Sequence, residues 1–303
     1  MLKRVLITGA GGMLGKDMAE IFAKDRKYKV FGTIREGGIK KPDVAYIKTD
    51  LRKVKDLKIV LLKSKPDIII HCAAMVNLDA CEENKKDVDL LHIGSTEALS
   101  SYKNKAVKFI YISTDSVFNG KSGNYTELDK PDPINYYSQS KLKGEQIAMT
   151  NNKNSLIVRT NIYGFHTPPG NSLVEWALHN FTLKNNINGF TDVFFNPVYT
   201  KQLVRTIKYI LENKKDILGM LNVGSTRPLS KYAFLKSLAT HFNFEPTLIR
   251  PASVNDSELK TPRPNNTTLK VAKLNKILDI KTLKISEGLA ELKKDYHNNF
   301  NHG

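Results

Sequence analysis

The chain has 303 residues, which is enough for one large domain or two modest ones with an ample core. Its 47 basic and 30 acidic residues give a formal net charge of +17. The lysines are spread in ones and twos, so we interpret them mostly as solvated surface and not as a nucleic-acid site, and a polyanionic small substrate would also profit from the positive field. Its cysteines, Cys72 and Cys81, fit neither a disulfide framework nor a zinc site, and no apolar run reaches the ~18 residues that cross a bilayer, so we expect a cytoplasmic protein without a metal or a membrane partner.

The chain opens with a strand at residues 5–7, a glycine loop and an amphipathic helix at residues 16–23. Gly9, Gly12 and Gly15 are three residues apart, which lets the backbone turn tightly and approach a pyrophosphate at the helix N-terminus. Because a strand precedes the loop and a helix follows it, the pattern predicts a dinucleotide-binding site. A strand this close to the first residue also leads us to expect no signal peptide.

The next two strands are expected at residues 29–34 and 45–47, and each ends near a candidate cofactor residue. Arg35 follows the first of them, where an NAD-selective site usually carries an acid for the ribose 2′-hydroxyl. An arginine favours a 2′-phosphate, so we predict NADP(H), with NAD(H) left open if Arg35 is only a surface residue. Asp50 and Leu51 follow the second, and the carboxylate of Asp50 is expected to reach the adenine amino group.

A fourth strand is expected at residues 67–71, and it opens on Cys72, Ala73 and Ala74. These small residues leave room for a cofactor ribose and nicotinamide. His71, at the end of the strand, is interpreted as a packed, hydrogen-bonded histidine and not as a catalyst. A helix is expected to follow at residues 86–102, with its apolar side chains towards the sheet.

The fifth strand, at residues 109–112, leads to the residues that can carry chemistry. Thr114 follows it, at the strand end where ligands bind in an open parallel sheet. After a long turn-rich loop, Tyr137 and Lys141 lie four apart on a helix that starts near Tyr136, so they share one face. We expect the lysine ammonium to lower the pKa of the phenol, Tyr137 to donate a proton to a reduced carbonyl, and Thr114 to hold the same oxygen.

A sixth strand at residues 155–158 completes an alternation of strands and helices that specifies a parallel, doubly wound sheet. Beyond residue 164 the pattern changes. We expect helices at residues 172–183, 199–211, 230–242 and 286–296, strands at residues 220–223 and 247–250, and a polar C-terminal tail without order. Trp176 is interpreted as a core residue and not as a sugar platform.

The predicted fold is therefore α/β, a Rossmann-like doubly wound parallel sheet with a smaller C-terminal α+β substrate domain. The dinucleotide-binding domain is expected to span residues 1–164 and to be completed by about residues 197–224. Residues 165–196 and 225–303 are expected to form the substrate domain over the cofactor cleft.

Several motifs occur in this order along the chain: Thr8-Gly9-Ala10-Gly11-Gly12-Met13-Leu14-Gly15, Ser113-Thr114-Asp115 with Val117-Phe118 and Gly120, Tyr137 with Lys141 and Gly144-Glu145, Arg159-Thr160, and Thr261-Pro262-Arg263-Pro264. With these motifs the chain resembles an extended short-chain dehydrogenase/reductase, and within that superfamily the dTDP-4-dehydrorhamnose reductase group of nucleotide-sugar 4-keto reductases. The resemblance covers nearly the whole length.

The resemblance implies NADPH-dependent reduction of the 4-keto group of a deoxy nucleotide sugar, in nucleotide-sugar and surface polysaccharide biosynthesis. It implies the catalytic residues Thr114, Tyr137 and Lys141. It implies cofactor contacts from Gly9, Gly12, Met13, Leu14, Gly15, Arg35, Asp50, Leu51, Cys72, Ala73, Ala74, Tyr137 and Lys141. It implies substrate contacts from Met75, Thr114, Asp115, Asn161 and Asn196, and it leaves a homodimer open.

Three positions depart from the group's pattern. Ser116 stands where the group tends to have a tyrosine, Asn161-Ile162 replace a segment with a tryptophan that packs on the sugar, and His92 replaces an asparagine. A wider and more polar sugar pocket is expected. Two alternatives remain within the same fold: a nucleotide-sugar epimerase that retains NAD, and a non-enzymatic NADP-binding regulatory subunit, because the regulatory subunit of methionine adenosyltransferase resembles this group.

Overall fold

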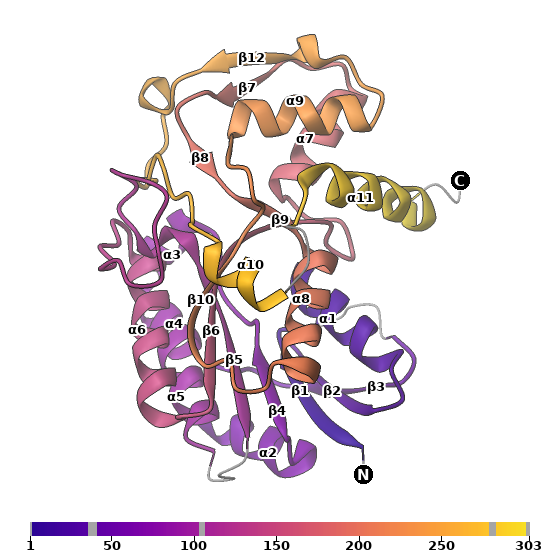
Figure 1. Ribbon diagram of the computed structural model, residues 1–303, viewed down its shortest axis with the longest axis vertical. Coiled ribbons are helices and arrows are strands. Elements are labelled where there is room, and N and C mark those ends of the chain that lie inside the picture. The colour runs from indigo at the N-terminus through magenta and orange to yellow at the C-terminus, as the bar shows by residue number, and fades with distance from the viewer. Residues whose placement is uncertain (1, 36–40, 103–106, 279–282, 301–303) are drawn as a thin grey trace.

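The apolar runs of the N-terminal half form one parallel sheet with helices on both faces, as a computed structural model of the chain shows (Figure 1). The structure describes residues 2–35, 41–102, 107–278 and 283–300. Within these residues, an eight-stranded sheet has the order β10-β6-β5-β4-β1-β2-β3, with β9 beside β6. Its strands are β1 (Lys3–Thr8), β2 (Tyr28–Ile34), β3 (Val44–Lys48), β4 (Ile68–His71), β5 (Lys108–Thr114), β6 (Ser155–Tyr163), β9 (Pro197–Tyr199) and β10 (Gly219–Val223). The predicted doubly wound fold is confirmed.

The sheet register brings the carboxyl ends of the central strands to one edge. Thr8 of β1 is paired with His71 of β4, and Thr114 of β5 with Thr160 of β6. Since the pairs are parallel, the loops that leave these four strands start side by side. This edge faces the second lobe of the molecule, at the top of the sheet in Figure 1.

Two hydrophobic cores, one on each face, hold the helices to the sheet. On one face α1 (Met13–Ala23), α8 (Thr200–Asn213) and α10 (Ala272–Leu278) pack on side chains such as Ile7 and Val158. On the other face, α2 (Val54–Ser64), α5 (Ser95–Ser100) and α6 (Tyr136–Asn151) cover side chains such as Leu6 and Phe109. Strands buried on both sides explain why the sequence shows continuous apolar runs and no alternation.

The second lobe has its own core under two short sheets (Figure 1). Its elements are α7 (Leu173–Thr182), β7 (Ile187–Phe190), β8 (Phe194–Phe195), β11 (Leu229–Ser230), α9 (Lys231–His241), β12 (Ile249–Ala252) and α11 (Ile285–Phe300). Ser172 caps α7 in a capping box with Glu175, which fixes the entry into the lobe. Trp176 packs against this core, as expected.

Several predicted elements need correction. The helix expected at residues 86–102 is α4 (Lys85–Val88), a π-helical segment at Asp89–Gly94 and then α5. The strand expected at residues 247–250 is a 3-10 turn followed by β12. The tail after Tyr296 was expected to lack order, but α11 continues to Phe300, and residues 301–303 lie outside the described residues. Sequence reasoning missed α2, α3 (Leu78–Glu83) and α10.

The chain returns to the sheet twice after residue 196. As predicted, α8 and β10 join the sheet lobe. Leu274 and Ile277 of α10 also lie in the core of the sheet, although residues 225–303 were assigned to the substrate domain. Apart from α10, which packs on the sheet and not in the substrate domain, the domain boundaries stay a prediction.

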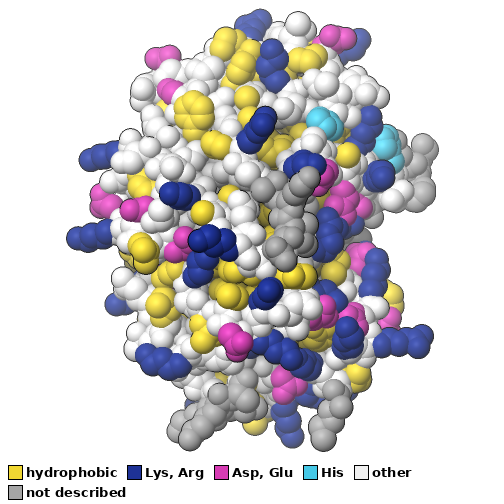
Figure 2. All heavy atoms as spheres, in the orientation of Figure 1, with side chains coloured by type: hydrophobic (Ala, Val, Ile, Leu, Met, Phe, Trp, Pro, Cys, Tyr) yellow, Lys and Arg dark blue, Asp and Glu magenta, His cyan; other side chains and the backbone are white. Residues whose placement is uncertain are grey.

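Basic side chains are dispersed over the surface. Figure 2 shows lysines and arginines scattered over one face with acidic side chains between them, and no single basic patch dominates that face. The visible distribution agrees with the interpretation of the lysines as solvated surface. A search of the described helices finds none with the length and apolar character that crossing a membrane requires.

Candidate active site

The glycine loop between β1 and α1 has no room for side chains at two of its positions. Gly9 has φ +66°, and a Cβ there would lie 2.9 Å from the Cα of Ala73. A Cβ on Gly15 would overlap the carbonyl oxygen of Gly9. The turn is therefore as tight as the motif predicts, and the N-terminus of α1 points at the space above it.

A cavity of about 510 Å³ lies above this turn, at the carboxyl edge of the sheet. The predicted cofactor residues Gly9, Gly12, Arg35, Asp50, Leu51, Cys72, Ala73 and Ala74 line it, together with Met75. Met13, Leu14 and Gly15 form the first turn of α1 instead. Sequence reasoning missed the opposite wall, which includes His166, Thr167, Pro168 and Gly170 from the second lobe's side.

One end of the cavity carries two arginines with different surroundings. Arg52 binds the carboxylate of Asp50 at 2.8 Å and that of Asp87 at 2.5 Å, and its hydrogen bond lowers the pKa of Asp50 to about 2. Asp50 thus lines the cavity, but its carboxylate is already paired with Arg52. Its contact with adenine stays a prediction. Arg35 is exposed and has no ion pair within the described residues, so its guanidinium is available to an anion. The spacing of Asp50 and Arg52 could have revealed their pairing.

His71 lies behind the far wall of the cavity and is within hydrogen-bonding distance of two hydroxyl groups. Its Nδ1 lies 2.6 Å from the hydroxyl of Thr8, which accepts hydrogen bonds from the backbone N–H groups of Cys72 and Ala73. Its Nε2 lies 3.1 Å from the hydroxyl of Ser95. Burial lowers the pKa of His71 to about 3, so the ring stays neutral. The interpretation of His71 as a packed, hydrogen-bonded residue is confirmed.

The structure brings the three predicted catalytic residues together at the end of β5. Asn135 caps α6 by accepting a hydrogen bond from Ser138, which sets the first turn and its Tyr137. The hydroxyl of Thr114 lies close enough to the phenol of Tyr137 to lower the pKa of the phenol by hydrogen bonding. The ammonium of Lys141 donates to the carbonyl of Ile112 at 2.7 Å.

The electrostatics of this trio differ from the expectation in one respect. Burial raises the pKa of Tyr137 above its usual value, the bond with Thr114 lowers it, and the charge of Asp115 raises it again. Burial also lowers the pKa of Lys141 to about 7, against the charges of Glu145 and Cys72. We expected Lys141 to lower the pKa of the phenol, but its ammonium is bound to Ile112 and lies 4.1 Å from the centroid of the Tyr111 ring. Desolvation therefore outweighs the lysine at Tyr137.

His92 supports the trio from the π-helical segment. Its Nε2 accepts the backbone N–H of Met75 at 2.8 Å, and its Nδ1 lies 2.8 Å from the hydroxyl of Ser140, which donates to the carbonyl of Tyr137. Burial lowers the pKa of His92 to about 2, so the ring is neutral and Nδ1 carries its proton. The polar support expected from an asparagine is present here as a histidine that links Met75 to Tyr137.

Asp115 joins three distant segments on the substrate side. Its carboxylate accepts hydrogen bonds from Thr267 at 2.6 Å, from Asn161 at 2.9 Å and from Thr114 at 3.2 Å. Burial raises the pKa of Asp115, and the bonds from Thr267 and Asn161 lower it. Ser116 also donates to it, at 3.2 Å. The predicted substrate residues Asp115 and Asn161 thus lie together beside Thr114.

The side chain of Asn196 is hydrogen-bonded to other parts of the chain than those of Asp115 and Asn161. Its amide donates to the carbonyl of Ser225 at 2.7 Å and accepts the N–H of Leu269 at 2.7 Å. Only 2% of the residue is exposed. Its side chain therefore joins two loops of the chain, and a substrate contact from Asn196 stays a prediction.

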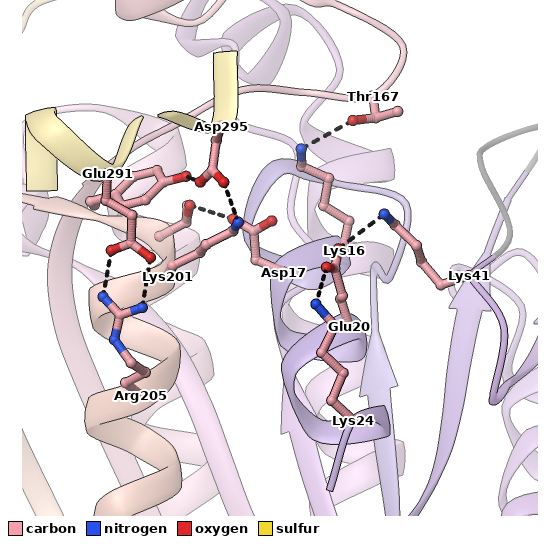
Figure 3. A network of polar contacts seen from close by, with 12 residues as sticks. Lys16, Asp17, Glu20, Lys24, Lys41, Thr167, Lys201, Arg205, Glu291 and Asp295 are labelled. Atoms are coloured by element: carbon pink, nitrogen blue, oxygen red, sulfur yellow. Dashed lines mark hydrogen bonds and ion pairs between the residues drawn. The ribbon is translucent and has the colours of Figure 1, made fainter. Parts of the chain in front are cut away.

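A polar network ties the start of α1 to the second lobe (Figure 3). Lys16, directly after the glycine loop, donates to Thr167 at 3.0 Å on the cavity wall. On the other side of α1, Asp295 of α11 accepts from Lys201 at 2.6 Å and from the hydroxyl of Tyr199. Figure 3 shows Lys16 reaching up to Thr167 from α1, with α11 above α8. These bonds join α1 and α8 of the sheet lobe to the second lobe.

Comparison with known proteins agrees with this geometry. The family model described as the RmlD substrate binding domain matches residues 3–298. The chain is 29% identical over 284 residues to methionine adenosyltransferase 2 subunit beta of Xenopus tropicalis, covering 91% of this chain and 82% of that protein. It is 29% identical over 266 residues to the spore coat polysaccharide biosynthesis protein SpsK of Bacillus subtilis, covering 87% of each.

A solved structure shows the same architecture. The dTDP-4-dehydrorhamnose reductase of Bacillus anthracis, in complex with NADP, superposes with a TM-score of 0.84 at 26% identity, covering 97% of this chain and 100% of that one. The resemblance inferred from the motifs is confirmed by the family model and by this structure together. The chain belongs to the RmlD substrate binding domain family, within the extended short-chain dehydrogenase/reductases.

Proposed function

We propose that the protein is an NADPH-dependent reductase that converts the 4-keto group of a deoxy nucleotide sugar to an alcohol, in nucleotide-sugar or surface polysaccharide biosynthesis. The observation that carries the proposal is that Thr114, Tyr137 and the buried Lys141 lie together at the end of β5, at the sheet edge that also holds the cavity. A hydroxyl pair of this kind can hold a carbonyl oxygen and protonate it as it becomes an alkoxide.

The cavity fits a dinucleotide on two observations. The glycine turn has no space for Cβ atoms at Gly9 and Gly15, so a pyrophosphate can approach the backbone N–H groups at the start of α1. Arg35 is exposed at the cavity and suits a 2′-phosphate by its planar fork. When bound, the nicotinamide cofactor supplies the hydride. A relative supports the assignment, since the Bacillus anthracis reductase was solved in complex with NADP.

The chain's own residues have separate roles in the proposed reaction. Thr114 hydrogen-bonds the keto oxygen and Tyr137 donates its phenolic proton to that oxygen. Lys141 supplies positive charge under the site, and its pKa of about 7 leaves part of it protonated at neutral pH. His92 positions the Met75 backbone directly and Tyr137 through the hydroxyl of Ser140. The high pKa of the buried phenol keeps it protonated and ready to donate.

The test is a turnover screen of nucleotide-linked 4-keto sugars, with NADPH oxidation followed by absorbance. We expect at least one of them to be reduced, and we expect NADH to be a poorer donor. A protein that binds NADPH but reduces none of a panel covering the thymidine and uridine nucleotides would overturn the reductase proposal.

The sugar itself is expected to be bulkier or more hydrogen-bonding than the rhamnose precursor. The segment Asn161-Ile162 stands where the group has a segment with a tryptophan, and the amide of Asn161 donates to Asp115. We therefore expect a wider and more polar pocket, without an apolar tryptophan contact worth about 1–3 kcal/mol. In a one-pot competition followed by mass spectrometry, a 2-acetamido 6-deoxyhexose should have a higher kcat/KM than dTDP-4-dehydrorhamnose. A preference of about tenfold for the rhamnose precursor would contradict this.

A second candidate is a non-enzymatic NADP-binding regulatory subunit. It is favoured by the 29% identity to methionine adenosyltransferase 2 subunit beta over 91% of this chain. The two candidates differ in a measurable way. A regulatory subunit binds NADPH without turnover and changes the kinetics of a methionine adenosyltransferase catalytic subunit when the two are mixed.

A further inference from the structure

One cation near the reaction centre has no role in the proposed chemistry. Lys231 is the first residue of α9, directly after Ser230, which caps this helix. Its ammonium lies 3.4 Å from the centroid of the Phe195 ring, and Phe195 is buried with 2% of its surface exposed. Within the described residues, the ammonium has no carboxylate within ion-pairing distance and no hydrogen-bond partner. Such a lysine usually turns outward to water.

The backbone fixes this lysine on the side of the second lobe that meets Asp115. β8, which contains Phe195, pairs antiparallel with β11, and the N–H of Lys231 donates to the carbonyl of Val193 at 2.9 Å. The other side of β8 contacts Thr267, whose N–H donates to the carbonyl of Phe194 at 3.1 Å. The hydroxyl of the same Thr267 binds Asp115. Lys231 is therefore joined to the catalytic Thr114 by a short series of contacts.

Lys231 lies near a negative and a positive side chain. Burial lowers the pKa of Lys231 to about 8, the charge of Asp115 raises it and that of Arg263 lowers it. Asp115 is already bonded by Thr267 and Asn161, so it does not form an ion pair with the lysine. The ammonium of Lys231 therefore lies near the substrate side of the site without an ion pair, and an anionic group of a ligand would stabilise it.

We propose that Lys231 binds an anionic oxygen group of the substrate and selects for it. The group is either the diphosphate of the nucleotide or a carboxylate on the sugar, since both offer oxygens to an ammonium. The proposal rests on the proposed function, because it assumes that a nucleotide sugar occupies this side of the site.

The experiment measures ligand binding by calorimetry with the NADPH-loaded protein. The probes are dTDP-glucose, UDP-glucose, UDP-glucuronate and inorganic pyrophosphate. The variants are Lys231→Met, Lys231→Gln and Lys231→Arg. The matched control is Lys236→Met, because Lys236 lies on the same helix, over the ring of Tyr232 at 5.3 Å, and is exposed. NADPH affinity and the melting temperature are measured for each variant, to separate loss of binding from loss of folding.

The expected result is that Lys231→Met and Lys231→Gln weaken binding by about tenfold or more, as for a charged hydrogen bond, while Lys231→Arg and Lys236→Met retain it. A loss with every diphosphate probe, pyrophosphate included, assigns the diphosphate. A loss confined to UDP-glucuronate assigns the sugar carboxylate. If the Met and Gln variants unfold, the folded Arg variant carries the test, and loss of anion binding in it would count against the proposal.

The proposal is overturned if all probes bind the Lys231 variants as they bind the wild type, or if the wild type binds none of them. Either result leaves the reductase proposal in place as long as NADPH-dependent turnover of a 4-keto sugar is observed. In the converse case, anion binding that depends on Lys231 without any turnover supports the anion site and contradicts the reductase.

Discussion

The two ends of the site are built in different ways. The cofactor end is made by short contiguous segments that follow β1, β2, β3 and β4, and its shape comes from backbone turns such as that at Gly9. The substrate end is made by side chains from distant segments, and Asp115 alone joins Asn161 and Thr267, which is 152 residues away in the chain. The first end tolerates little change in local backbone, whereas the second depends on how loops of two lobes meet.

This difference predicts separable effects. Substitutions at the cofactor end should change NADPH binding or selectivity without affecting sugar recognition, and substitutions at the substrate end should do the reverse. The proposed catalytic trio lies between the two ends and should affect turnover, and Lys141, an expected cofactor contact, should affect NADPH binding as well.

The largest effect is expected for Tyr137→Phe. Removing the phenolic proton donor should lower kcat by a factor on the order of 10² or more, while the ring still packs and NADPH affinity stays nearly unchanged. Steady-state kinetics and NADPH fluorescence titration measure the two quantities. Tyr136→Phe is the control, because the phenol of Tyr136 donates to Asp89 at 2.8 Å. A Tyr137→Phe enzyme with a tenth of the wild-type kcat would contradict the role of the phenol.

Arg35→Asp tests the cofactor end. Arg35→Asp replaces a guanidinium, which can bind the 2′-phosphate, with a carboxylate, which repels it. The ratio of kcat/KM for NADPH over NADH should therefore shift by about tenfold or more towards NADH. The KM of the sugar should not change. Arg26→Asp, an exposed arginine after α1, is the charge-matched control. Equal use of both cofactors by the wild type, or a retained NADPH preference in the variant, would make Arg35 a bystander.

Thr267→Val tests the substrate end with a near-isosteric change. It removes the 2.6 Å donor from the buried Asp115, which should cost about 1–3 kcal/mol of unfolding free energy and raise the KM of the sugar. NADPH affinity should stay at the wild-type value. Thr240→Val on the exposed side of α9 gives the cost of the substitution alone. Weakened NADPH binding in Thr267→Val would show that the two ends are coupled.

The smallest effect is expected from pH, and it concerns the trio. The pKa of Lys141 is lowered to about 7, so its ammonium is present below that pH and is lost above it. If the positive charge assists proton donation from Tyr137, kcat should decline as pH rises through about 7, by about twofold at the midpoint. Lys143→Met, an exposed lysine on the same helix, should keep this profile. A rate that is flat between pH 6 and pH 8 would remove Lys141 from this role.

The free energy of unfolding should also depend on the protonation of Lys141, but it should rise with pH where kcat falls. A lysine whose pKa is lowered in the folded protein binds fewer protons there than in the unfolded chain. Its contribution therefore lets the free energy of unfolding rise with pH from about 7 towards the pKa of the unfolded lysine. Chemical denaturation of the wild type and of Lys141→Met at pH 6 and pH 9 compares the two slopes.

The sequence by itself determined the cofactor end and the location of the trio. Apolar runs, the glycine spacing and the four-residue interval between Tyr137 and Lys141 are local properties, and the parallel sheet follows from their alternation. For that reason Gly9, Arg35 and Ala73 were found in the cavity wall as predicted. The sequence also showed that Asn161 and His92 depart from the family pattern.

Only the tertiary structure decided which partners the buried polar groups have. Lys141 bonds to Ile112 and not to Tyr137, Asp115 takes its donors from Asn161 and Thr267, and Lys231 lies on the ring of Phe195. These contacts join residues 29 to 152 positions apart, so no periodic pattern records them. Burial then sets the pKa of each group, because desolvation depends on what both lobes place around it. The sequence pattern predicts which strand, helix or loop carries a side chain. The packing of the two lobes determines its hydrogen-bond partners and its pKa.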